Sequence, residues 1–188
     1  MPRASVQHTI PVDSKWLSTG QPAQGADMTT TPFDDHIAFD RRWSHGDPET
    51  KHALAAADPL LFVADHIPSG DRREGSVAVA LASHDGQSAL MVVSDAPVQP
   101  PDIECLGLLS TAIERSGGDV RTLGIVHHRR GGHGITDIDR RWALALTAMC
   151  TAFDIKPLGV MARLYTGDIV RVPLPDVLPA DYLDALER

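Results

Sequence analysis

Apolar residues recur along most of this chain at the spacings typical of strands and helices. Short apolar runs between turn residues predict strands at residues 60–64, 77–82, 89–93, 120–128, 158–165 and 169–172. Apolar positions three or four residues apart predict helices over 101–115 and 136–153, and the pair Asp47-Pro48 predicts the start of another over 47–57. The pair Asp85-Gly86 predicts a tight turn that joins the second and third strands as a hairpin.

This order of elements predicts a fold of the α/β class. A hairpin, a helix, a strand, a helix and a second hairpin fit a single sandwich of three layers, in which helices flank a mixed sheet. The domain is expected to span residues 47–173, and residues 174–188 to form a tail with a short helix from about Ala180. Residues 1–46 are rich in Pro, Ser, Thr and Gln without an apolar period, which predicts a poorly ordered arm; Met28 within it is an alternative start.

Composition narrows the classes of function. The formal net charge of −8 is spread along the 188 residues, which argues against a general nucleic-acid binder because such proteins cluster Lys and Arg. Cys105 and Cys150 lie in apolar helical patterns, so we expect reduced core residues. No apolar stretch is long enough to cross a bilayer and the N-terminus lacks the apolar core of a signal peptide, so the expected location is the cytoplasm, with no membrane partner.

The richest concentration of chemistry-bearing groups is the segment Val126-His127-His128-Arg129-Arg130-Gly131-Gly132-His133-Gly134-Ile135-Thr136-Asp137-Ile138-Asp139. It places three histidines and a glycine-rich bend between a predicted strand and the start of a predicted helix. A functional site is therefore expected here.

This segment resembles the motif His-x-His-Pro-Ser-Gly-x-x-x-Pro-Ser-x-x-Asp of the JAB/MPN metalloproteases, especially their RadC-like branch. Aligned without gaps, the motif places His128 on its second histidine, Gly131 on its glycine, Thr136 on its serine and Asp139 on its aspartate. The resemblance covers about residues 75–172, including the order of hairpin, helix, motif strand, helix and strand. It implies a peptidase-like sandwich with a metal centre after the motif strand.

The metal-binding part of the motif is incomplete. Val126 stands at the first histidine, and because side chains alternate along a strand, His127 is expected to point away from the face shared by Val126 and His128. A shifted alignment puts His127 first and Arg129 second, and requires a deletion. A catalytic zinc needs three protein ligands and an open position.

The resemblance leaves two hypotheses for function. With the ligand set broken, we expect a non-catalytic protein-binding or scaffolding module without a cofactor, which binds an unidentified protein partner and is compatible with a homodimer. The alternative is a zinc-dependent amide or isopeptide hydrolase. It would bind zinc through His128, Asp139 and His133, activate water with Glu74 and stabilise the oxyanion with Thr136.

Other interpretations of the same residues stay open. Thr136 and Asp139 also fit a capping arrangement at the start of the helix, and His127 and His128 fit hydrogen-bonded structural groups. A site for a phosphate or nucleotide is a third possible function, because free N–H groups at a helix start bind anions. It would use Arg129, Arg130, Gly131, Gly132 and Gly134, although Asp137 and Asp139 bring negative charge to the same turn.

Overall fold

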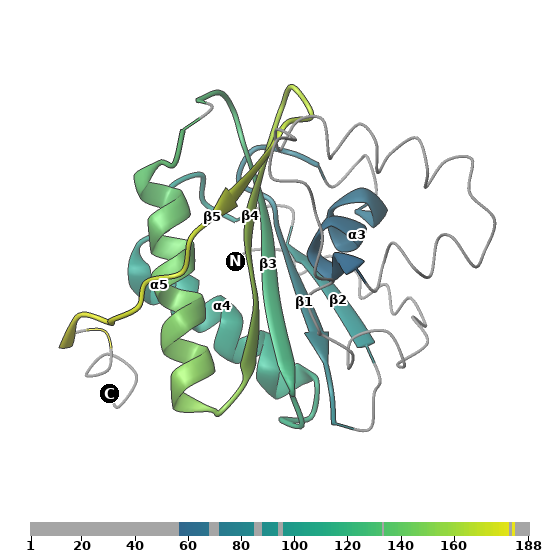
Figure 1. Cartoon of the computed structure of the whole chain (residues 1–188), viewed down its shortest axis with the longest axis vertical. Helices are drawn as coiled ribbons and strands as arrows, with labels where there is room; N and C mark the ends of the chain where they lie inside the picture. Colours follow the sequence, from purple (N-terminus) through teal and green to yellow (C-terminus); the bar gives the residue numbers. More distant parts are fainter. Residues whose placement is uncertain are drawn as a thin grey trace.

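Five strands form one mixed sheet with helices on both faces (Figure 1). The computed structural model describes residues 57–67, 72–84, 88–93, 96–132, 134–180 and 182. Its elements, in chain order, are α3 (Pro59–His66), β1 (Val77–Ala82), β2 (Ser88–Val93), α4 (Asp102–Arg115), β3 (Thr122–Arg129), α5 (Asp137–Ala152), β4 (Lys156–Leu164) and β5 (Ile169–Val172).

The strand order is β2-β1-β3-β4-β5. β3 and β4 are parallel and α5 connects them, whereas β1 pairs antiparallel with β2 and β3, and β4 pairs antiparallel with β5. Helices α4 and α5 cover one face and α3 the other (Figure 1). The prediction of a three-layer α/β sandwich with a mixed sheet is confirmed, including both hairpins.

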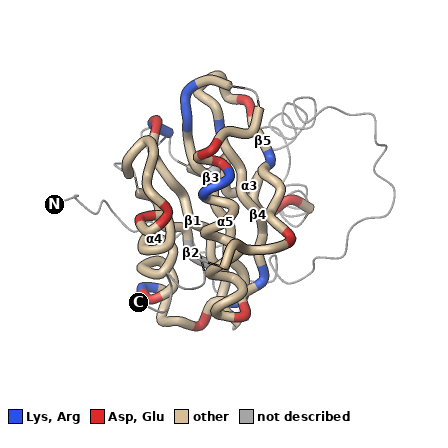
Figure 2. Tube along the Cα trace, turned by 90° about the vertical axis from the view of Figure 1, so that its left-hand side faces the viewer, with Lys and Arg blue, Asp and Glu red and all other residues tan. Residues whose placement is uncertain are grey.

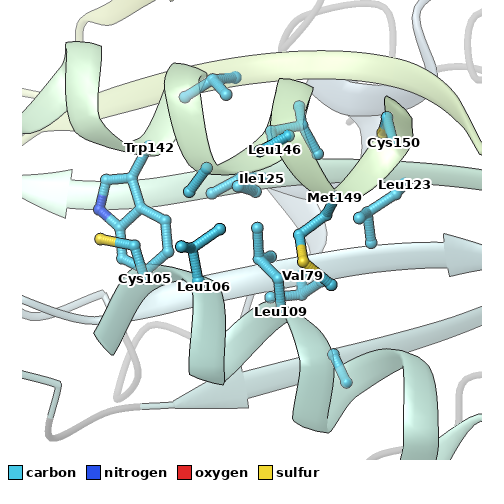
Figure 3. Close-up of a cluster of buried hydrophobic side chains, with 14 of the residues drawn as sticks. Val79, Cys105, Leu106, Leu109, Leu123, Ile125, Trp142, Leu146, Met149 and Cys150 are labelled. Atoms are coloured by element: carbon cyan, nitrogen blue, oxygen red, sulfur yellow. The ribbon is translucent and has the colours of Figure 1, made fainter. Parts of the chain in front are cut away.

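The larger core lies between the sheet and the α4–α5 layer. Alternate residues of β1 and β3, such as Val79 and Ile125, are fully buried against these two helices because strand side chains alternate between faces. Figure 3 shows Trp142 and Met149 of α5 pointing toward α4 and the sheet. Cys105 and Cys150 are buried free cysteines in this core, as predicted.

The second core lies under α3. Ala78, Val126 and Met161 project from three neighbouring strands and pack against the helix, which contributes Leu60, Leu61, Ala64 and Ile67. The approach is close at Gly124, where a Cβ atom would lie 2.9 Å from Leu60 Cδ1. This glycine therefore allows α3 to lie directly on β3.

The strand predicted at 60–64 is wrong, because these residues belong to α3. Pro59 starts this helix rather than ending the preceding one: Asp58 is the N-cap and its side chain accepts a hydrogen bond from Leu61 N at 3.2 Å. An apolar run of this length fits either a strand or a buried helix, and periodicity alone does not separate the two. The buried positions Leu60, Leu61, Ala64 and Ile67 have helical spacing.

The two long predicted helices are confirmed, but each apolar stripe is shorter than expected. Ile103 in the first turn of α4 is 62% exposed, and Phe153 after the last turn of α5 is 55% exposed. The expected N-terminal arm and, apart from Ala57, the helix over 47–57 lie outside the described residues, as does most of the C-terminal helix. Within the described ranges, no helix combines the length and apolarity needed to cross a membrane.

Candidate functional site

The last residues of β3 point to opposite faces of the sheet. His127 faces α5, where its ring centroid lies 6.4 Å from that of Trp142. Arg129, two residues on, reaches Asp139 of α5. Val126 packs on the α3 side, and His128 shares that direction. The motif strand therefore sends its functional groups to two separate places.

The Asp139 carboxylate is completely buried beside Arg129. Arg129 Nε donates to Oδ1 and Nη2 donates to Oδ2, each at 3.0 Å. The backbone N–H of Thr136, the N-cap residue of α5, donates to Oδ2 at 2.7 Å, which is the carboxylate half of a capping box. His127 Nε2 lies 2.9 Å from Oδ1. The capping interpretation of Thr136 and Asp139 is thus confirmed.

These contacts saturate the carboxylate. An ionised carboxylate offers about four lone-pair directions, and each oxygen of Asp139 already has two nitrogen partners. Burial alone would raise the pKa of Asp139, but hydrogen bonds from His127, the Thr136 N–H and Arg129 outweigh it and hold the pKa well below its usual range. Burial lowers the pKa of His127, which keeps this imidazole neutral. Asp139 is an anion matched by one guanidinium.

The glycine-rich loop presents carbonyl oxygens to Arg129. The guanidinium donates to the carbonyls of Gly131, Gly132 and Gly134, the last two at 2.6 and 2.7 Å. An anion site needs converging N–H groups, and on this side the loop supplies acceptors instead. The geometry does not favour the phosphate or nucleotide site predicted on this loop.

His128 lies on the other side of β3 beside Ser76. The Oγ atom of Ser76 is 2.9 Å from His128 Nδ1, and the two backbones are joined by a hydrogen bond from His128 N to Ser76 O, also 2.9 Å. The His128 side chain is buried, and its Nε2 atom has no hydrogen-bond partner among the described residues. Burial and then the nearby Arg163 charge lower the pKa of His128 to about 4, so the imidazole is neutral at pH 7.

A pocket of about 170 Å³ opens beside His128 at the carboxyl ends of the parallel strands β3 and β4. Ligands of α/β sheets commonly bind at this edge. Figure 2 shows basic and acidic positions close together around this end of the sheet. The pocket is lined by Arg72, Glu74, His128, Arg129, Arg130, Arg163, Leu164, Tyr165 and Gly167.

The predicted zinc-hydrolase residues are divided between these two places. Glu74 lies in the pocket with His128, where its Oε2 atom is 3.0 Å from Arg130 Nε. Thr136 and Asp139 lie on the α5 side. His133 lies outside the described residues. Within the part of the chain that the structure describes, no three His, Cys, Asp or Glu side chains converge as metal ligands do.

Some residues of the two places carry no signal in the sequence. Ser76 lies 52 positions from His128, and Arg163 lies 98 positions from Asp65, whose Oδ1 atom it contacts at 3.0 Å. For the Asp139 cluster, the sign in the sequence is the shifted alignment of His127 and Arg129. No protein family, curated protein or solved structure significantly matches this chain. The site is therefore interpreted from its own geometry.

Proposed function

We propose that this protein is a non-catalytic protein-binding or scaffolding module on a JAB/RadC-like fold, in which Arg129 takes the place of a metal ion. The single observation that carries the proposal is the saturated Asp139 carboxylate. The order of elements, with a hairpin before α4 and with α5 connecting β3 to β4, agrees with the order that the resemblance implies.

The arrangement of Arg129 supports a substitution for the metal. His127 and Arg129 lie two residues apart on one face of β3, and Asp139 approaches them from α5. This is the placement that the shifted alignment gives to the two histidines and the aspartate of the motif. The guanidinium provides the positive charge that a buried carboxylate needs, in a two-pronged geometry that matches it.

The residues present do not fit a catalytic zinc ion. A guanidinium has no lone pair to offer a metal and is not deprotonated in proteins. Asp139 has no open lone-pair direction, and Glu74 and His128 lie in the pocket across β3. The same fold with a filled, charge-balanced site is suited to presenting surfaces to a partner rather than to hydrolysis.

Zinc content tests the proposal. Protein purified without chelator is dialysed against zinc and measured by atomic emission, together with the variants Arg129→His, Asp139→Asn and His128→Ala. We expect substoichiometric zinc in the wild type, and a gain of zinc in Arg129→His, which provides two histidines on the Asp139 face. Arg140→His is the matched control, since Arg140 is exposed and pairs with Asp137 on the surface of α5.

Two results would overturn the proposal. One is stoichiometric zinc in the wild type that is lost in both Asp139→Asn and His128→Ala. The other is zinc-dependent hydrolysis of an amide or isopeptide substrate by the wild type. Either result would favour the metal-dependent hydrolase.

A further inference from the structure

The pocket beside His128 collects side chains from four separate segments. Arg72 and Glu74 precede β1, His128 and Arg130 come from the end of β3, and Arg163 ends β4. Leu164, Tyr165 and Gly167 complete the wall through the turn between β4 and β5. The pocket lies across β3 from the Asp139 cluster, so its residues are distinct from those that replace the metal.

Three groups in this pocket keep hydrogen-bond donors available to a ligand. Arg163 donates from Nη1 to Ala64 O at 2.6 Å and to Asp65 Oδ1 at 3.0 Å, and a guanidinium has further N–H groups on Nε and Nη2. Arg130 contacts Glu74 through Nε while its side chain is 76% exposed. The imidazole of His128 is 5% exposed and its Nε2 lacks a partner among the described residues.

We infer that this pocket binds a carboxylate group of a partner polypeptide, held by Arg163, Arg130 and the Nε2–H of His128. The Ser76 hydroxyl, donating to Nδ1, keeps the proton of the neutral imidazole on Nε2. Ser76 is thus a positioning residue. The inference rests on the proposed function, since it identifies the partner chemistry of the binding module.

The pocket selects a carboxylate over a phosphate. Glu74 already supplies a carboxylate to Arg130, so a ligand carboxylate can exchange for it with the same fork geometry. A dianionic phosphate beside Glu74 would meet stronger repulsion from that negative charge. The volume of about 170 Å³ holds a carboxylate and a short stem.

The rim indicates a polypeptide as the source of the carboxylate. Tyr165 is 84% exposed at the rim. Aromatic and arginine side chains are enriched at the centres of protein interfaces, where a buried anchor is surrounded by packing contacts. Tyr165 gives such packing to the residues that carry the carboxylate.

Short peptides test the inference by NMR titration of the full chain, monitoring the Gly167 amide and the His128 ring. The probes are acetyl-Gly-Ala-Leu with a free C-terminus, its C-terminal amide, acetyl-Gly-Glu-Leu-amide and inorganic phosphate. We expect the acid-bearing peptides to bind with a Kd on the order of 1 mM and the amide without an acid at least about tenfold more weakly. The tighter of the two acid peptides shows whether a chain terminus or an acidic side chain is preferred.

Arg130→Gln is the main variant because this exposed side chain can change without disturbing the core. We expect about tenfold weaker binding of the acid peptides, as for loss of one charge-assisted hydrogen bond. Arg140→Gln, an exposed arginine at the start of α5, is the matched control and should bind like the wild type. Tyr165→Ala should weaken the peptides about threefold, by loss of rim packing, and leave acetate unaffected.

Equal binding of the acid peptide and its amide overturns the inference, as does tighter binding of phosphate or no shift with any probe at about 50 mM, a concentration well above the expected Kd. These outcomes are independent of the zinc assay. Zinc in the wild type would overturn the proposed function while the peptide titration still reports on the pocket. Loss of carboxylate binding would leave the Arg129 substitution intact.

Discussion

Arg129 and Asp139 form a two-pronged ion pair that joins the end of β3 to the first turn of α5. Their side chains are 7% and 0% exposed, and both bonds measure 3.0 Å. Asp139 also accepts from the Thr136 N–H, and Arg129 also donates to the glycine-rich loop. The pair therefore fixes the strand, the loop and the helix start together.

Removing one member of this pair should be strongly destabilising. Arg129→Ala leaves the buried Asp139 charge without its main partner, and we expect a loss of about 3–5 kcal/mol in the free energy of unfolding, measured by urea denaturation. The exposed pair Asp137 and Arg140 on the same helix turn is the control, and Arg140→Ala should change stability by less than about 0.5 kcal/mol. A loss below about 1 kcal/mol for Arg129→Ala would show that water relieves the charge.

The double variant Arg129→Met with Asp139→Leu separates the pair from its surroundings. Replacing both charges with apolar groups is often nearly neutral, so we expect a smaller loss than for either single variant. The interaction term from the full thermodynamic cycle should exceed about 2 kcal/mol. Additive losses would show that the two side chains act independently.

Stability should fall as the pH drops from 7 toward 4. Burial lowers the pKa of His128 from 6.5 to about 4, so between these values the unfolded chain binds a proton that the folded chain does not. The contribution is complete above pH 6.5 and is lost as the pH falls through the folded pKa, with a slope approaching about 1.4 kcal/mol per pH unit. The lowered pKa of His127 acts in the same direction.

The slope of stability against pH identifies the histidine responsible. Urea unfolding of wild type and His128→Asn between pH 4.5 and 7 should show a shallower slope in the variant, by up to one proton. His84, which is exposed after the end of β1, serves as the control in His84→Asn. Identical slopes for the wild type and His128→Asn would show that His128 titrates alike in folded and unfolded chains.

Much of the fold is predictable because its signals are local. Turn residues and apolar runs predict all five strands of the sheet, and the alternation of side chains along a strand correctly predicts that His127 and His128 face opposite ways. The first helix is missed because Pro59 can either end or start a helix, and the five apolar or small residues after it fit either type of element.

The two functional places are less predictable because they depend on contacts between distant segments. Nothing in the sequence shows that Ser76 faces His128 or that Arg163 closes the pocket beside it. The gap-free alignment puts His128 and Asp139 in one site, although strand alternation gives that face to Arg129. A guanidinium in a ligand position is visible in the shifted alignment, but its partner is not.

Two glycines in different surroundings test the packing of α3 on β3. A Cβ atom at Gly124 would lie 2.9 Å from both Leu60 Cδ1 and Leu158 Cβ, so Gly124→Ala should force α3 outward and cost about 1–3 kcal/mol. Gly107 lies in the exposed middle of α4, where an added Cβ would have no atom within 4 Å, and Gly107→Ala should stabilise by about 0.5–1 kcal/mol. Thermal unfolding measures both, and equal effects would contradict the close approach of α3.

The N-cap of α3 provides a test of its helical start. Asp58 accepts a hydrogen bond from Leu61 N at 3.2 Å and also contacts Arg171 of β5, so Asp58→Ala removes both interactions. We expect a loss of about 1 kcal/mol from the cap, because the first N–H groups of a helix then lack a partner. Asp58→Asn keeps a capping oxygen without the charge and should retain most of the stability. Arg171→Ala removes the exposed ion pair alone, and its effect should stay below about 0.5 kcal/mol. Equal losses in Asp58→Ala and Arg171→Ala would assign the stability to the ion pair instead of the cap.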